Sequence, residues 1–154
     1  MPPIREIPNP FSDGACFFCG ALNASGLKLA FFLDEETGEA FADYTAEARF
    51  CGQKDLLHGG MQMGLLDEAM WWAGYAATGE TRAVTVNARF RFLRPVYVGD
   101  AIRISCRMTS RDDRDIHLRG RILNPEGKVC TAVTGTYRVL DQTQYDRLVT
   151  GLKK

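Results

Sequence analysis

The 154-residue sequence has no excess charge of either sign, because 19 basic side chains balance 19 acidic ones. It also has no extended basic run with interleaved aromatic residues, which argues against a nucleic-acid-binding protein. The first residues, MPPIREIPNPF, lack the apolar segment of a secretory signal peptide. The five cysteines are an odd number without the spacing of a disulfide framework. We therefore expect a cytoplasmic protein with reduced thiols.

The longest apolar segment is the stretch 61–77, MQMGLLDEAMWWAGYAA. Its length of 17 residues and its apolar composition predict a helix. Asp67 and Glu68 are its only residues charged at neutral pH, and apolar side chains lie on every side, as in a buried helix. This length is at or below what a bilayer span needs, and the Gly and Asp content argues further against a membrane segment. The stretch therefore predicts the buried central helix of a single domain.

Two features of this segment favour chemistry over simple packing. The sequence His58-Gly59-Gly60 leads into the helix, where unpaired N–H groups and the positive dipole end favour negative charge. A carboxylate such as Asp67 in an apolar helix costs free energy unless it has a partner or a task. Together they indicate catalysis. A structural cap is the alternative for Asp67, and orientation of the loop is the alternative for His58.

The remaining segments predict an α+β fold. Strand-like patterns occur twice before the central helix and four times after it, which predicts an antiparallel β-sheet wrapped around one long helix. In the strand 83–93, alternation places Val84 and Val86 on the core face and Thr85 on the opposite face. We expect an extended arm at 1–15, the folded domain at 16–141, and a tail or short helix at 142–154. The predicted strands are 27–33, 39–46, 83–93, 101–109, 115–123 and 128–140.

Charge is distributed unevenly along the chain. Residues 1–88 carry 5 basic and 12 acidic side chains, whereas residues 89–138 carry 11 basic and 5 acidic ones. Two interpretations fit this pattern about equally well: a partner that carries phosphates, or a solvated sheet face that is rich in arginine.

The segment 16–20, CFFCG, contains two cysteines with two residues between them. A structural zinc ion needs about four ligands, and neither a second cysteine pair nor a nearby histidine is evident. The favoured interpretation is therefore a turn that packs Phe17 and Phe18. Zinc binding or redox chemistry is the less favoured interpretation, and no metal is expected.

The residues also carry a family resemblance. The segment HGGMQMGLLDEA, followed after one strand by FLRPVYVGD, resembles the hotdog-fold acyl-CoA thioesterases of the phenylacetate-degradation type, in the 4-hydroxybenzoyl-CoA thioesterase superfamily. The upstream pattern C-x-x-C-G-x-x-N-x-x-G-L matches a common N-terminal variant of that group. The resemblance covers roughly residues 16–139. It implies a hotdog fold, hydrolysis of an acyl-CoA thioester, and no cofactor besides the coenzyme A of the substrate.

The resemblance implies the catalytic groups. It places the catalytic acid at Asp67, selected over Glu68 by the spacing from the paired glycines. This acid acts as a general base on water or as a nucleophile, and the sequence leaves both open. The oxyanion donor falls on the backbone N–H of Gly59 or Gly60, beside His58.

Further site residues follow from the same resemblance. Thr85 corresponds to a Ser or Thr that helps to place the nucleophilic water, which requires a bulge in its strand. Gln53 corresponds to a polar amide ahead of the histidine, with Gly52 where other members have Asn. The basic segment of the chain, and not the resemblance, supplies the candidate contacts for the phosphates of coenzyme A, Arg91, Arg94 and Lys128. Arg94 is favoured because it lies in the family's Arg-Pro turn.

One chain cannot place both donor and acid at the same carbonyl. Seven helical residues separate Gly60 from Asp67, which is about 10 Å at 1.5 Å per residue. Two antiparallel helices related by a two-fold axis remove this gap, so we expect at least a dimer, and the resemblance implies that dimers often pair into tetramers. No nucleic-acid or membrane partner is expected. The alternatives are a hotdog module that binds acyl-CoA without turnover and a hotdog hydratase or dehydratase.

Overall fold

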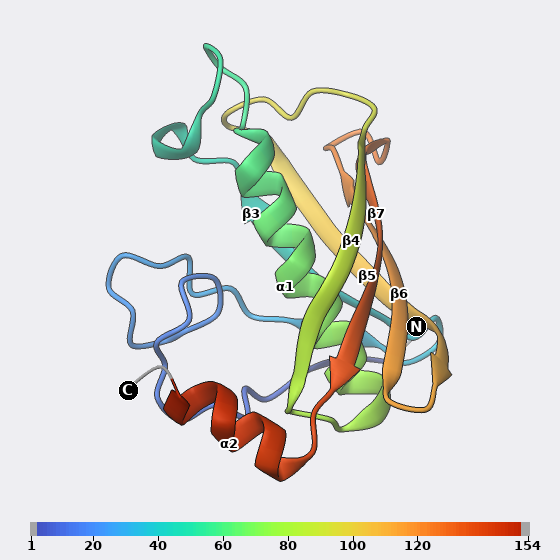
Figure 1. Cartoon of the computed structure of the whole chain (residues 1–154). Coiled ribbons are helices and arrows are strands. Elements are labelled where there is room, and N and C mark those ends of the chain that lie inside the picture. Colours follow the sequence, from blue (N-terminus) through green and yellow to red (C-terminus); the bar gives the residue numbers. More distant parts are fainter. Residues whose placement is uncertain (1–2, 152–154) are drawn as a thin grey trace.

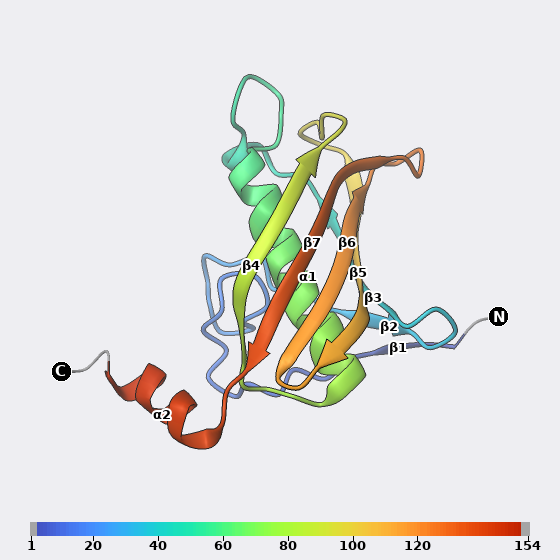
Figure 2. The same ribbon diagram turned by 45° about the vertical axis from the view of Figure 1, so that its right-hand side comes forward.

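The computed structural model describes residues 3–151 (Figure 1). Within this range, an antiparallel sheet in the order β1-β2-β3-β5-β6-β7-β4 packs against the long helix α1 (Gly59–Thr78). A 3₁₀ turn, η1 (Ala48–Phe50), precedes α1, and helix α2 (Gln142–Gly151) projects from the sheet after the last strand (Figure 2). The strands are β1 (Ile4–Glu6), β2 (Phe32–Asp34), β3 (Glu39–Thr45), β4 (Ala83–Phe92), β5 (Ala101–Asp112), β6 (Asp115–Leu123) and β7 (Val129–Val139).

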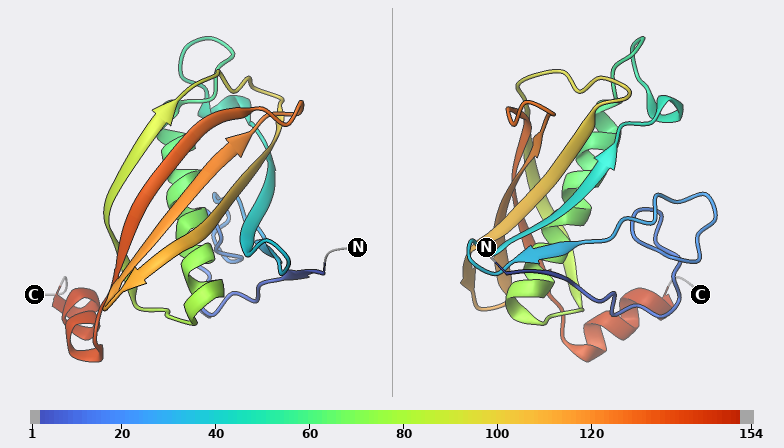
Figure 3. Two further views of the ribbon diagram at one scale, coloured as in Figure 1. Left: turned by 90° about the vertical axis from the view of Figure 1, so that its right-hand side faces the viewer. Right: turned by 180° about the vertical axis from the view of Figure 1, so that it is seen from behind.

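The sheet wraps around α1. Strands β3, β5, β6, β7 and β4 all contact this helix, and Figure 3 shows α1 lying along the inner face of the sheet. This arrangement confirms the predicted α+β fold. Residues 1–2 of the predicted arm and 152–154 of the predicted tail lie outside the described residues.

Helix α1 is slightly longer than the predicted segment 61–77. It ends where Gly79 adopts a φ of 74°, in the left-handed region that glycine tolerates, and the Gly79 N–H donates to the Tyr75 carbonyl at 2.7 Å. Trp72 is 2% exposed and stacks on Phe31, with ring centroids 5.3 Å apart, so the core lies between α1 and the sheet. Within residues 3–151, neither helix is long and apolar enough to cross a membrane.

The N-terminal strands differ from the prediction. The predicted strand 27–33 is wrong for most of its length, because β2 has only three residues. The N–H groups of Leu27 and Leu29 donate at 2.9 and 2.8 Å to carbonyls in the segment 16–20. This backbone is therefore satisfied by the cysteine-containing turn and needs no neighbouring strand. Part of the predicted extended arm is itself a strand, β1, which pairs with β2.

A bulge in β4 changes the faces predicted for that strand. Opposite β7, the register shifts immediately after Thr85 and leaves Val86 without a partner residue. Thr85 pairs with Tyr137 and faces α1, whereas Val84 lies on the outer face of the sheet. The predicted core positions of Val84 and Val86 are therefore wrong, and Val86 is 43% exposed.

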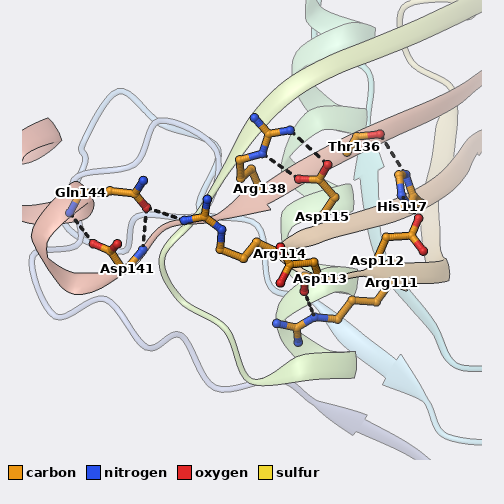
Figure 4. A network of polar contacts seen from close by, with 10 residues as sticks. All are labelled: Arg111, Asp112, Asp113, Arg114, Asp115, His117, Thr136, Arg138, Asp141 and Gln144. Carbon is orange, nitrogen blue, oxygen red and sulfur yellow. Dashed lines mark hydrogen bonds and ion pairs between the residues drawn. The ribbon is translucent and has the colours of Figure 1, made fainter.

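Polar contacts at one end of the sheet join the β5–β6 hairpin to β7 and α2 (Figure 4). Arg138 donates two hydrogen bonds to the Asp115 carboxylate, at 2.8 and 3.1 Å. Arg114 donates to the side chain of Gln144 at 2.9 Å, which connects the hairpin to α2. Solvent screens these exposed groups, so they orient α2 and contribute little to stability.

A buried amide ties the first turn of α1 to the sheet. Gln62 is 5% exposed, and its Nε2 donates to the Leu57 carbonyl at 3.1 Å. The hydroxyl of Thr131, which is fully buried on β7, donates to the Gln62 Oε1. Because both side chains are removed from water, losing one leaves the other unsatisfied.

Thr131→Val is expected to lower the free energy of unfolding by about 1–3 kcal/mol, because the Gln62 oxygen stays buried without a donor. Denaturant unfolding followed by tryptophan fluorescence measures this change. Thr134→Val, at an exposed position of the same strand, is the matched control and should change stability by less than about 0.5 kcal/mol. Equal losses in the two variants would contradict the role of this buried pair.

Candidate active site

The carboxylate of Asp67 is fixed by two hydroxyl groups from the sheet. Asp67 is half-buried in α1, and the Thr85 Oγ1 donates to its Oδ1 at 2.8 Å. The Tyr137 hydroxyl also lies within hydrogen-bonding distance of Oδ1 and of the Asp67 carbonyl. Within residues 3–151, Oδ2 has no hydrogen-bond partner. One carboxylate oxygen is therefore anchored, and the other is available to a reactant.

Tyr137 is a site residue that sequence reasoning missed. Burial, and after it the charge of Asp67, raises the pKa of Tyr137 above its usual range. Its hydroxyl therefore remains a donor at neutral pH. The sequence holds one signal for it: Tyr137 falls on the inward-facing register of β7 together with Val133 and Gly135, where a buried hydroxyl needs a polar partner.

Of the first four N–H groups of α1, those of Gly60, Met61 and Gln62 have acceptors among the described residues and that of Gly59 has none there. The Nδ1 of His58 accepts a hydrogen bond from the Gly60 N–H at 2.8 Å, and the Met61 and Gln62 N–H groups donate to the His58 carbonyl. Nothing within residues 3–151 accepts the N–H of Gly59. In this arrangement His58 caps the helix, and the Gly59 N–H remains as the donor at the positive end of the helix.

A hollow of about 380 Å³ opens beside Gly59. Arg94 lines it, and this guanidinium donates to the Val129 carbonyl at 2.8 Å. Of the other predicted phosphate contacts, Arg91 lies opposite Ala132 on the outer face of the sheet, and Lys128 follows the exposed turn before β7. The hollow is also lined by Leu56, Leu57, Gln62, Phe92, Leu93, Pro95 and Val96.

Gln53 lies in the exposed loop before α1, not beside Asp67. It borders a separate hollow with Tyr97, and its carbonyl accepts the Leu56 N–H at 2.9 Å within the loop. About two turns of helix separate this loop from Asp67. Within one chain, the structure therefore brings Thr85 to Asp67 but does not bring Gln53 there.

Gly59 and Asp67 occupy the same helix, so the axial gap between them is fixed. One face of α1 is left partly uncovered by the rest of the chain, and Met63 on this face is 40% exposed. The residues of this stripe recur at helical spacing: Gly60, Met63, Asp67 and Trp71. This open stripe runs beside β4, the last strand of the sheet order.

Comparison with known proteins identifies the family. The family model described as the thioesterase superfamily matches residues 55–131, which is half of the chain and includes both Gly59 and Asp67. The chain belongs to the thioesterase superfamily. A search of curated proteins gave no match for this superfamily member.

Solved structures share the fold of this superfamily member. A thioesterase superfamily protein is 23% identical with a TM-score of 0.73, over 80% of this chain and 60% of that one. A putative thioesterase from Ralstonia eutropha, described as phenylacetic acid degradation-related, is 28% identical with a TM-score of 0.61. The match covers 70% of this chain and 80% of that one. A Streptococcus mutans protein bound to acetyl CoA is 17% identical with a TM-score of 0.63. The match covers 67% of this chain and 82% of that one.

Glu68 has different neighbours from Asp67. Its Oε1 accepts a hydrogen bond from the Trp72 Nε1 at 3.1 Å, and the Cys16 thiol lies 3.6 Å from the same oxygen. Burial, and then Glu68, raises the pKa of the Cys19 thiol above its usual range. The two adjacent acids of this superfamily member therefore lie in separate polar environments.

Several arginines of the basic segment are paired with carboxylates on the surface. Arg103 makes two hydrogen bonds to Asp43 at 2.8 and 2.9 Å, and Arg121 lies 3.4 Å from Glu39. Such pairs place part of the basic excess of residues 89–138 on a solvated sheet face, which is one of the two interpretations of the uneven charge. Two further pairs of this kind within residues 3–151 are Arg111–Glu80 and Arg138–Asp115.

Proposed function

We propose that this protein hydrolyses an acyl-CoA thioester to a free acid and coenzyme A. The observation that carries the proposal is the Asp67 carboxylate, which Thr85 and Tyr137 hold at one oxygen while the other has no partner within residues 3–151. Membership of the thioesterase superfamily supports the reaction class. Coenzyme A enters as part of the substrate, and no other cofactor takes part in the proposal.

Asp67 acts in one of two ways. As a general base, its Oδ2 takes a proton from water while the water oxygen attacks the thioester carbon. As a nucleophile, Oδ2 attacks that carbon itself and forms a mixed anhydride, which water then cleaves. In both routes the C–S bond breaks and the sulfur leaves as the coenzyme A thiolate, which takes up a proton. The Thr85 Oγ1 donates a hydrogen bond to Asp67 and can still accept one from the water.

The Gly59 N–H stabilises the oxyanion of the tetrahedral intermediate. It lies at the N-terminus of α1, while the Gly60 N–H is occupied by His58. A preorganised donor of this type contributes a factor of about 10²–10³ in rate. His58 is therefore a positioning residue, because it fixes the loop and caps the helix.

The site is composite and requires two chains. The outer edge of β4 pairs with no strand within residues 3–151, and Phe92 and Leu93 are 53% and 47% exposed there. Antiparallel pairing of two β4 edges extends the sheet and places two α1 helices side by side. Gly59 of one chain then meets Asp67, Thr85 and Tyr137 of the other.

Arg94 contacts the phosphates of coenzyme A. It lines the hollow that contains Gly59, so the chain that supplies the oxyanion donor also supplies this cation. The S. mutans structure with acetyl CoA supports a ligand of this class on the same fold. Arg91 and Lys128, the other predicted contacts, lie outside this hollow.

Asp67→Asn is expected to lower kcat at least a hundredfold, because the amide is neither a base nor a nucleophile. Release of coenzyme A thiol from a panel of acyl-CoAs, followed with a thiol-reactive dye, measures the reaction. Asp43→Asn, an exposed carboxylate on β3, is the matched control and keeps wild-type turnover. Binding without thiol release by the wild type would favour the non-catalytic module, and consumption of an enoyl thioester without thiol release would favour a hydratase.

Arg94→Ala is expected to raise KM several-fold for acyl-CoA, because an arginine–phosphate contact contributes mainly to ground-state binding. KM for the same acyl group on a short thiol without the nucleotide should not change. Steady-state kinetics with both substrates measures the difference, and Arg89→Ala, on the outer face of β4, is the control. A similar increase for both substrates would contradict the phosphate contact.

A composite site predicts complementation between two inactive variants. A Cβ at Gly59 would lie 3.5 Å from the Phe92 ring, an ordinary contact, so Gly59→Val can fold while its bulk blocks the oxyanion position. Mixing it with Asp67→Asn under subunit exchange gives heterodimers with one intact site each. An equimolar mixture should recover about a quarter of wild-type activity. If exchange is shown by mass spectrometry and no activity returns, both groups act within one chain.

A further inference from the structure

The turn at 16–20 brings two thiols and a carboxylate together at α1. The Cys16 Sγ lies 3.6 and 3.8 Å from the two Glu68 oxygens. The donor atoms of Cys16, Cys19 and Glu68 all lie within 4.8 Å of one another. Among residues 3–151, this is the one group of three or more His, Cys, Asp or Glu side chains whose ligand atoms come so close.

The backbone of this turn holds the thiols in place. The Gly20 N–H donates to the Cys16 carbonyl at 2.8 Å, and a Cβ at Gly20 would lie 2.3 Å from the Gly14 carbonyl oxygen. Only glycine fits so close an approach of backbone segments. The ring of Phe18 packs against Gly64 of α1, which fixes the turn to the helix beside Glu68. The backbone of the turn and its packing against α1 therefore fix the positions of the three residues of the cluster.

We propose that Cys16, Cys19 and Glu68 bind a zinc ion that fastens the N-terminal turn to α1, with water as the fourth ligand. Two thiolates select a borderline-soft cation over calcium or magnesium, which prefer oxygen ligands alone. The Trp72 Nε1 donates to Glu68 at 3.1 Å and holds the carboxylate, as an outer-shell partner of a zinc ligand does. Zinc replaces the two thiol protons, which are released to solvent. The inference revises the sequence expectation of no metal, and it does not depend on the proposed function.

Metal analysis tests the site without any activity assay. Protein produced with zinc and purified under reducing conditions without chelator should contain one zinc ion per chain. Cobalt bound in place of zinc should give a thiolate-to-cobalt charge-transfer band. Cys16→Ser and Cys19→Ser should lose the band. Glu68→Gln removes a direct ligand and should weaken zinc binding by at least about tenfold in competition with a chelating dye, since losing only an outer-shell partner already costs that much.

Cys51→Ser is the matched control, because Cys51 is an exposed cysteine in the loop before α1. It should keep both the zinc and the cobalt band. Zinc should raise the melting temperature of the wild type and of Cys51→Ser but not that of Cys16→Ser. Wild-type protein that binds neither zinc nor cobalt would overturn the proposal. A loss of zinc and of the cobalt band in Cys51→Ser equal to that in Cys16→Ser would also overturn it. A Cys16–Cys19 disulfide in the reduced preparation would overturn it as well.

Discussion

A carboxylate inside a helix that packs against a sheet must be met by hydrogen-bond donors, and this requirement organises the middle of the molecule. Thr85 and Tyr137 supply the donors to Asp67 from two adjacent strands. Thr85 can do so only because the bulge at Val86 shifts the strand by one residue and turns the threonine inward. The irregularity in β4 is thus part of the site and not a defect in the sheet.

The same helix separates three kinds of surroundings. Successive residues on a helix point about 100° apart, so neighbours in the sequence face different parts of the structure. Asp67 faces the hydroxyls of β4 and β7, Glu68 faces Trp72 and the cysteine turn, and Leu66 is buried in the core. Packing of α1 against the sheet requires only its apolar side chains and does not by itself require either acid. The polar contacts at each acid offset the cost of withdrawing it from water.

The sequence predicted the elements that local patterns determine. The apolar stretch 61–77 gave the helix, and alternation gave the four strands after it, since both depend on residues close together in the chain. It could not predict the contact of Tyr137 with Asp67, which are 70 residues apart. The short β2 was mispredicted because Leu27 and Leu29 alternate like a strand while their N–H groups are taken up by another segment. The inward position of Thr85 contradicts simple alternation, and only the family resemblance pointed to it.

The open edge of β4 links stability to the proposed activity. A ten-residue edge strand with one unpaired side and exposed apolar side chains invites association with other chains unless that side is covered. Strand β4 contacts Asp67 through Thr85 and lies next to Gly59 through Phe92. The proposed edge pairing would therefore bury the apolar residues and bring donor and acid together in one step. In the proposed dimer, a chain that separates from its partner would lose the cover of its edge and its complete site at once. Asp67 and Gly59 need not be close within one chain under this proposal, because pairing at the sheet edge would set the distance between them across the two-fold axis.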